Sequence, residues 1–179
     1  KSEAEIRTLT TLEKSSQVLM TVISDVLDYS RLEAGGVQIE NRPFVPAEIL
    51  TDVVSILTPA AKRNNLTLLA TPRHAPELSW TADAARIRQV LLNLAGNAVK
   101  FTPAGCVELV SWVSPDSAAH SGRRLYFSVK DTGPGIPADR LEAIFEPFVQ
   151  LETNPVLSQA GTGLGLSICR RLVQMMGGQ

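Results

Sequence analysis

Three separated segments combine side chains that bind phosphate, metal ions and nucleotide bases. Residues Asn93-Leu-Ala-Gly-Asn97-Ala-Val-Lys100 lie in a helical pattern and supply two carboxamides and an ammonium group. Asp131-Thr-Gly133-Pro-Gly135 places a carboxylate directly after a strand-like run, and Gly161-Thr-Gly163-Leu-Gly165 opens a later helix. Each segment alone is weak support for a ligand site. In this order and spacing they favour a nucleotide site.

The helical segment carries a polar stripe. Gln89, Asn93, Asn97 and Lys100 follow spacings of four, four and three, which places them on one side of a helix. Amide oxygens suit a hard cation such as Mg²⁺, and an ammonium group meets phosphate charge. The alternative is an ordinary polar flank, although such a flank usually carries Glu and Lys rather than carboxamides.

The two glycine-containing segments supply complementary groups. Asp131 follows the alternating run Leu125, Phe127 and Val129, and it can accept a hydrogen bond from an exocyclic amine such as that of adenine. The glycines after it allow close approach, although any Asp-Gly turn can imitate this motif. The segment from Gly161 precedes a helix whose backbone N–H groups favour phosphate. This segment lacks the Lys-Ser/Thr ending of a P-loop, and no Rossmann unit surrounds it. The alternative interpretation is a plain loop before a helix.

Composition indicates a globular domain rather than a disordered chain. The 179 residues are 44% hydrophobic and 20% charged, and the formal net charge is -1. We therefore expect no nucleic-acid partner and no direct membrane contact. Cys106 and Cys169 lie in apolar patterns, as buried free thiols in a reducing compartment do. No membrane-spanning run or signal-peptide pattern is present, so the expected location is cytoplasmic, including the cytoplasmic part of a membrane-bound sensor.

The first part of the chain predicts one helix from about Thr8 to Ala34, ended by Gly35-Gly36. Leu12, Leu19 and Val26 repeat every seven residues, which suits a helical hairpin or coiled coil. The alternative is a helix packed on its own domain.

Further helices are expected at Ala47 to Asn64, from Asp83 to Phe101, near Pro137 to Phe145, and from about Gly163 to Met176. Strands are expected at Leu66 to Ala70, Cys106 to Val113 and Leu125 to Asp131, with a strand-like stretch at Val37 to Glu40 and a turn at Pro72 to Pro76. The helix after Asp83 should bury Ile87, Val90, Leu91, Leu94, Ala98 and Phe101. Helices on an antiparallel sheet give the predicted fold class, a two-layer α/β (α+β) sandwich.

The sequences NAVKFT, DTGPG, EPFVQ and GTGLGLSI resemble the N, G1, F and G2 boxes of sensor histidine kinases, particularly hybrid ones. The resemblance implies the ATP-binding fold shared with Hsp90, type II topoisomerases and MutL-type proteins. It implies ATP and Mg²⁺ as ligands, with the metal on Asn97, phosphate contacts from Asn93 and Lys100, and adenine recognition by Asp131. The remaining implied nucleotide-binding residues are Gly133, Gly135, Ile136, Gly161, Thr162, Gly163, Leu164, Gly165 and Leu166. A mobile lid from about Gln150 to Gly161 is also implied. Within this lid, Ser158-Gln159-Ala160 lack the basic residue and first glycine that family members usually carry. Their loss would weaken phosphoryl transfer more than nucleotide binding.

The segment DVLDYSRLEAG resembles the second helix of the family's dimerisation and phosphotransfer hairpin. The implied organisation is a partial hairpin at residues 1–36, a linker at 37–45, and an ATP-binding domain at 46–179 that stops before its final strands. The family's acceptor histidine is missing, because Ala4-Glu5-Ile6-Arg7-Thr8 resembles that motif with alanine in the histidine position. Either the sequence joins pieces across an omitted hairpin, or the hairpin is degenerate. In the first case Glu5 would orient the acceptor imidazole.

The resemblance implies a histidine kinase core of a two-component system. It would pass the γ-phosphoryl group of ATP to a histidine and then to the aspartate of a receiver domain, in the same or another protein, and it would act as a homodimer through the hairpin. The alternatives are a catalytically impaired nucleotide-binding or kinase-interaction module, and an ATPase of the topoisomerase or chaperone branch.

Overall fold

The protein is described by a computed structural model that covers residues 3–115, 123–150 and 161–179. The chain divides into two compact units. The first unit consists of Lys1–Gln38 and Ala138–Arg171, and the second of Ile39–Pro137 and Leu172–Gln179.

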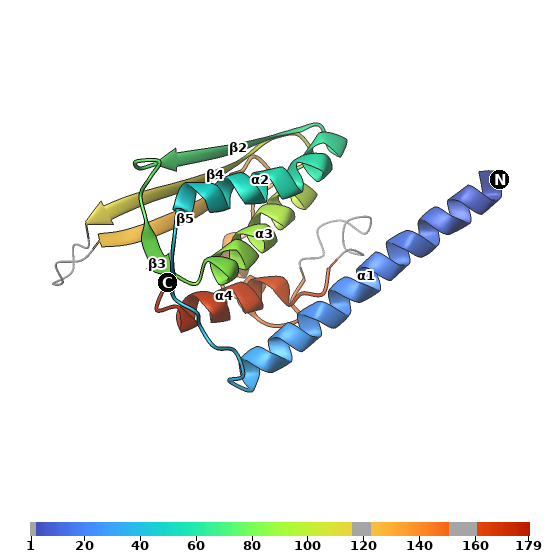
Figure 1. Ribbon diagram of the computed structural model, residues 1–179. Coiled ribbons are helices and arrows are strands. Elements are labelled where there is room, and N and C mark those ends of the chain that lie inside the picture. Colours follow the sequence, from blue (N-terminus) through green and yellow to red (C-terminus); the bar gives the residue numbers. More distant parts are fainter. Residues whose placement is uncertain (1–2, 116–122, 151–160) are drawn as a thin grey trace. The chain divides into compact units, whose positions relative to one another are not determined.

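A single long helix, α1 (Glu3–Glu33), begins the first unit (Figure 1). It confirms the helix expected from Thr8 and begins five residues earlier. Gly35 has a φ of +66°, and the N–H of Gly36 donates to the carbonyl of Arg31, so the glycine pair ends the helix in the expected way. The heptad side chains are exposed, at 58% for Leu12, 59% for Leu19 and 43% for Val26. Among the described residues, no helix combines the length and apolar character that crossing a membrane requires.

The rest of the first unit contains two short 3-10 turns, η1 (Ala138–Arg140) and η2 (Ala143–Phe145), and most of helix α4 (Gly165–Met175). The single short helix expected near Pro137 to Phe145 was therefore wrong. A helix of that length forms few of its own backbone hydrogen bonds, so the segment adopts tighter turns instead.

The main sheet of the second unit has the order β2–β4–β5, where β2 is Leu66–Arg73, β4 is Gly105–Pro115 and β5 is Arg123–Asp131. β4 and β5 are antiparallel, but β2 and β4 are parallel, so the expected antiparallel sheet was wrong in part. A helix lies between β2 and β4 in the chain and returns it to the starting end of the sheet, which makes the next strand parallel.

A second, two-stranded sheet pairs β1 (Arg42–Phe44) with β3 (Trp80–Ala82). The strand-like stretch at Val37 to Glu40 was misplaced, because pairing begins only at Arg42. The turn expected at Pro72 was also misplaced, since β2 continues to Arg73. A proline is tolerated there because β2 lies at an edge of its sheet.

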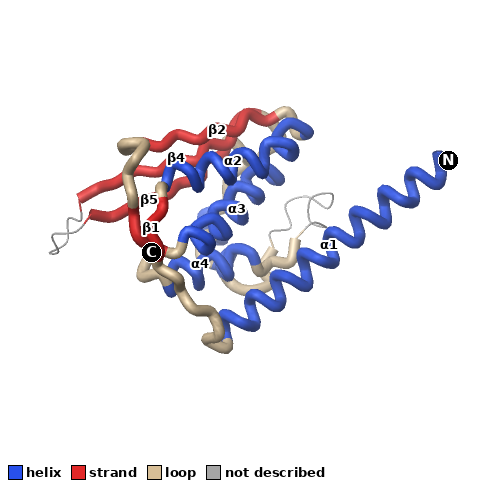
Figure 2. Tube along the Cα trace, viewed as in Figure 1, coloured by secondary structure: helices blue, strands red, loops and turns tan. Residues whose placement is uncertain are grey.

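Helices α2 (Pro46–Arg63) and α3 (Ala84–Phe101) cover one face of the main sheet (Figures 1 and 2). The predicted two-layer α/β sandwich is confirmed. Its buried core combines one face of each helix with the inner face of the strands and consists of Ile49, Leu50, Val53, Ala61, Leu66, Leu91, Ala95, Ala98, Val99, Val107 and Leu109. Phe101, expected in this core, is 39% exposed, because it is the last residue of α3.

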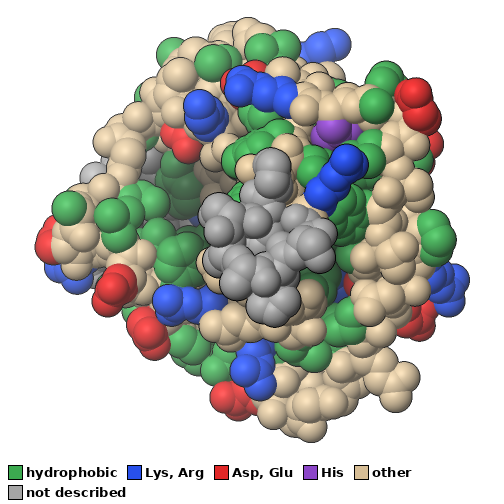
Figure 3. Space-filling view, turned by 90° about the vertical axis from the view of Figure 1, so that its left-hand side faces the viewer, with side chains coloured by type: hydrophobic (Ala, Val, Ile, Leu, Met, Phe, Trp, Pro, Cys, Tyr) green, Lys and Arg blue, Asp and Glu red, His purple; other side chains and the backbone are tan. Residues whose placement is uncertain are grey.

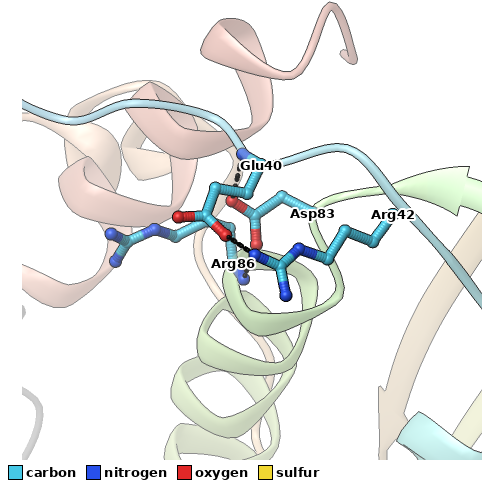
Figure 4. Close-up of polar contacts among 4 residues, drawn as sticks. All are labelled: Glu40, Arg42, Asp83 and Arg86. Atoms are coloured by element: carbon cyan, nitrogen blue, oxygen red, sulfur yellow. Dashed lines mark hydrogen bonds and ion pairs between the residues drawn. The ribbon is translucent and has the colours of Figure 1, made fainter.

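The carboxylate of Asp83 joins the linker to the start of α3 (Figure 4). Its Oδ1 accepts the backbone N–H of Arg86 at 3.1 Å, and its Oδ2 accepts the backbone N–H of Glu40 at 3.0 Å. Asp83 is only 5% exposed, so these two backbone N–H groups, rather than water, satisfy its buried carboxylate. The ion pair between Arg42 and Glu40 is exposed at 77% and 66% and contributes little by comparison.

Replacing this carboxylate should destabilise the second unit. Asp83→Ala removes the helix cap and leaves the Glu40 N–H without its acceptor, so the free energy of unfolding should fall by about 1–3 kcal/mol. Asp83→Asn retains one acceptor oxygen, so its free energy of unfolding should fall by less. The measurement is urea unfolding, with exposed Glu77→Ala as the control, which should stay within about 0.5 kcal/mol. An Asp83→Ala variant as stable as wild type would contradict this role.

Candidate functional site

The polar stripe of α3 forms as predicted. The side-chain amide of Asn97 donates to Oδ1 of Asn93 at 3.4 Å, and Gln89 accepts from Arg86 at 3.0 Å. Both asparagines are half-buried. The opposite face of the helix is held in the core, so the stripe cannot rotate away from its position.

Lys100 ends this stripe in the last turn of α3, one residue before the helix ends. Its Nζ lies 4.4 Å from the ring centroid of Phe101. Partial burial lowers the pKa of the Lys100 ammonium, because desolvation disfavours the charged form. A phosphate group beside it would oppose that effect, since an opposite charge favours protonation.

Asp131, at the end of β5, folds its carboxylate back onto its own turn. Oδ1 accepts the backbone N–H of Gly133 at 2.8 Å and lies 3.5 Å from the hydroxyl of Thr102. Among the described residues, no donor to Oδ2 is found. The side chain is exposed, so this oxygen can accept a hydrogen bond from an amine.

The same turn is anchored by Thr132, which the sequence reasoning did not single out. Its hydroxyl accepts the N–H of Cys106 at 3.1 Å and lies 3.2 Å from the carbonyl of Ala104. A Cβ on Gly105, whose φ is +112°, would collide with this hydroxyl. The only signal in the sequence was a threonine beside the aspartate, which local hydrogen bonding also explains.

The end of α3 and the Asp131 turn approach each other closely at Gly133. A Cβ at this position would lie 2.8 Å from Oδ1 of Asp131, 3.2 Å from the hydroxyl of Thr102 and 3.4 Å from the carbonyl of Phe101. A side chain here would therefore displace the Asp131 carboxylate, whose Oδ1 is the nearest atom. Beyond it, Gly135 has a φ of +73° and Ile136 is 44% exposed. The structure thus brings the predicted base-binding turn to the helix that carries the asparagines.

The glycine segment, residues Gly161 to Leu166, lies in the first unit and begins α4. The hydroxyl of Thr162 accepts the backbone N–H of Leu164 at 3.2 Å, a local turn that leads into the helix. Gly163 has a φ of +72°, and a Cβ there would lie 2.7 Å from the backbone of Phe148.

This segment is paired with the phenylalanine-containing segment Phe145 to Gln150. The N–H of Phe148 donates to the carbonyl of Gly163 at 3.0 Å, and the side chain of Gln150 donates to the carbonyl of Gly161 at 2.7 Å. Two motifs that resemble the F and G2 boxes therefore form one structural element within the first unit.

The predicted site residues fall into these two units. Asn93, Asn97, Lys100 and the turn from Asp131 to Ile136 lie in the second, and Gly161 to Leu166 in the first. Their assembly into one nucleotide site stays a prediction. Glu5 is exposed on α1 and its role also stays a prediction. The lid residues Ser158-Gln159-Ala160 lie outside the described residues.

Charged groups of both signs share the surface. Figure 3 shows one face, on which basic and acidic side chains are interspersed with hydrophobic ones. The formal net charge of -1 fits this mixture. Any attraction of this face for a polyanion must therefore come from a local group of donors rather than from a uniformly basic surface.

Comparison with known proteins identifies this fold. Residues 82–179 match the family of histidine kinase-, DNA gyrase B- and HSP90-like ATPases. Because this match covers more than half of the residues, the chain belongs to that family.

Similar proteins are sensor kinases. The chain is 37% identical over 171 residues to the sensor protein GacS of Pseudomonas syringae pv. syringae, covering 96% of this chain and 19% of that one. It is 40% identical over 182 residues to hybrid signal transduction histidine kinase A of Dictyostelium discoideum, covering 99% of this chain and 8% of that one. The chain therefore spans less than a fifth of the length of either relative.

Solved structures agree with these relatives. Full-length ShkA in complex with AMPPNP has a TM-score of 0.79 and 36% identity, covering 98% of this chain and 35% of that one. Histidine kinase ThkA in complex with the response regulator TrrA has a TM-score of 0.71 and 25% identity, covering 99% of this chain and 46% of that one.

The geometry predicts the effect of two substitutions on nucleotide binding. Asn97→Ala removes an amide oxygen from the stripe, and Asp131→Ala removes the acceptor from the turn. Each should weaken the affinity for Mg-ATP by about tenfold or more, since a charged or buried hydrogen bond contributes about 1.5–3 kcal/mol. Calorimetric titration tests this, with urea unfolding to show that both variants fold. Unchanged affinity in both variants would rule out the site.

Proposed function

We propose that this chain is the ATP-binding core of a sensor histidine kinase, which transfers the γ-phosphoryl group of ATP to a histidine. The observation that carries this proposal is the close approach of the Asp131–Gly133 turn to the end of α3. That contact holds a carboxylate for the base and a polar helix face for the phosphates in the same part of the second unit. The family of the chain supports the same activity.

Each group has a distinct part in nucleotide binding. Oδ2 of Asp131 would accept the exocyclic amine of adenine, while Gly133 allows the base to approach the backbone. Asn93 and Lys100 would contact the phosphates, and the N–H groups of the glycine segment would bind them at the start of α4. Phosphoryl transfer needs little covalent work from a protein, so positioning and charge neutralisation supply most of the catalysis.

The donor set of α3 fits a magnesium ion. The half-buried carboxamides of Asn93 and Asn97 lie side by side, and amide oxygens are ligands that Mg²⁺ accepts together with substrate phosphates. We propose that Asn97 holds the ion. When bound, the ion would neutralise charge that develops on the β- and γ-phosphates.

The acceptor histidine is proposed to lie outside these 179 residues. Both ring nitrogens of His74 are engaged, Nε2 with the hydroxyl of Ser111 at 2.8 Å and Nδ1 with the carbonyl of Ala75 at 3.0 Å. Ser111 is fully buried, so this contact satisfies a core hydroxyl and suits a structural role. His120 lies outside the described residues. If the acceptor precedes Glu5, the carboxylate of Glu5 would orient its imidazole.

Labelling separates this function from its alternatives. Incubation of the full-length protein with γ-labelled ATP should yield stoichiometric, acid-labile phosphate that maps to a histidine. Asp131→Ala should reduce the label at ATP concentrations near the wild-type dissociation constant, because the nucleotide is held less tightly. Nucleotide binding without labelled protein would instead indicate an impaired regulatory module. Repeated ATP hydrolysis without phosphoprotein would indicate an ATPase of the topoisomerase or chaperone branch.

We also propose that α1 mediates a homodimer. Its heptad side chains Leu12, Leu19 and Val26 are all more than 40% exposed, and an apolar seam of this period suits helix pairing. A receiver domain in the same or another protein would take the phosphoryl group next. The complex of ThkA with a response regulator supports that partner by similarity.

Charges placed in this seam should weaken dimerisation. A Leu12→Asp/Leu19→Asp double variant would bury two unpaired carboxylates, so the dimer dissociation constant should rise by about tenfold or more. Sedimentation equilibrium measures it. Met20→Asp/Ser24→Asp adds the same charge at exposed positions, one and five residues after Leu19, that lie away from the heptad seam, and serves as the control. Equal dissociation constants for both double variants would contradict a dimer through this seam.

A further inference from the structure

The glycine segment contacts α1 through one short hydrogen bond. The hydroxyl of Thr162 donates to Oδ2 of Asp25 at 2.6 Å, and both residues belong to the first unit. Asp25 is half-buried, which strengthens a hydrogen bond to its charge relative to one in open water.

A second contact lies one turn further along the same side of α1. The rings of Tyr29 and Phe148 have centroids 6.4 Å apart and planes inclined by 59°, within the usual range for an aromatic pair. Phe148 is itself hydrogen-bonded to Gly163. Residues 25 and 29 of α1 therefore contact two segments that are joined to each other.

The contact with Asp25 occupies a hydroxyl donor that an anion would need. Thr162 gives its hydroxyl hydrogen to the carboxylate, and its oxygen accepts the N–H of Leu164. Both donors stand at the start of α4, where backbone N–H groups and the helix dipole favour negative charge. In this arrangement the negative charge beside the segment comes from the protein itself.

The charge of Asp25 also acts on Cys169, which follows the first turn of α4. Burial raises the pKa of the Cys169 thiol to about 12, and the Asp25 carboxylate adds to that effect. A negative group that disfavours a thiolate there also disfavours other anions nearby.

We propose that Asp25 is a positioning residue that acts through Thr162 to oppose nucleotide phosphate at the glycine segment. This inference rests on the proposed nucleotide-binding function. A triphosphate bound by the segment must displace the hydrogen bond of Thr162 to Asp25 and lie close to a carboxylate of like charge. Nucleotide binding and the contact with α1 are therefore mutually exclusive, and each weakens the other to the same extent.

Two substitutions separate the hydrogen bond from the charge. Asp25→Ala removes both, whereas Asp25→Asn keeps an acceptor oxygen and removes only the charge. Asp25→Ala should raise the affinity for Mg-AMPPNP by about threefold to tenfold, as expected for a partly exposed charged hydrogen bond, and Asp25→Asn should raise it by a smaller factor because the hydrogen bond is kept. The gain should be smaller for ADP, because it carries less phosphate charge. A residue that only stabilised the fold would not change the ratio of the two affinities.

Calorimetric titration of the 179-residue chain measures these affinities. Glu13→Gln makes the same charge change on an exposed part of α1 and should bind like wild type. In a Thr162→Val background the gain from Asp25→Ala should shrink, since the two residues act as a pair. Additive effects of the two substitutions would contradict action through Thr162.

The outcomes distinguish this inference from the function on which it rests. If wild type binds Mg-AMPPNP and both Asp25 variants bind with the same or lower affinity, the role of Asp25 is overturned and the nucleotide site stands. If no variant binds, Asp25→Ala included, both proposals are overturned. Binding by Asp25→Ala where wild type binds weakly or not at all would support both.

Discussion

Burial of one face of α3 against the main sheet is the constraint on which the candidate site depends. Leu91, Ala95, Ala98 and Val99 lie in the core, so the rotation of the helix about its axis is determined by packing. Asn93 and Asn97 are displaced from this face by the helical period and remain accessible. Carboxamides with middling helix propensity can be kept at these positions because the core, rather than propensity, holds the helix.

Close backbone approach provides the second constraint, and it recurs at two places. Gly133 lets the Asp131 turn reach the end of α3, and Gly163 lets the glycine segment reach the backbone of Phe148. A side chain at Gly163 would collide with the backbone of Phe148, and one at Gly133 would displace the Asp131 carboxylate and crowd Thr102. The glycines in these motifs therefore serve packing between segments as well as any approach of a ligand.

The two units use their polar groups differently. In the second unit, buried Asp83 satisfies two backbone N–H groups and ties the linker to α3, which is a structural use of a carboxylate. In the first unit, half-buried Asp25 bonds a hydroxyl in the segment proposed to bind phosphate. The hydrogen bond between Asp25 and Thr162 costs free energy only when an anion must enter the glycine segment. For this reason it suits control of nucleotide binding.

The sequence by itself determined the helix boundaries of α2 and α3, the cap at Asp83 and the polar stripe, because period and capping are local properties. The nucleotide motifs were equally readable, since each is a short contiguous run. The parallel pairing of β2 with β4, the extension of β2 through Pro72, and the anchoring of the turn by Thr132 were decided only by tertiary structure. So was the bond between Thr162 and Asp25, which are 137 residues apart. Such contacts depend on which surfaces meet after the chain folds, and no local pattern of residue types records that choice.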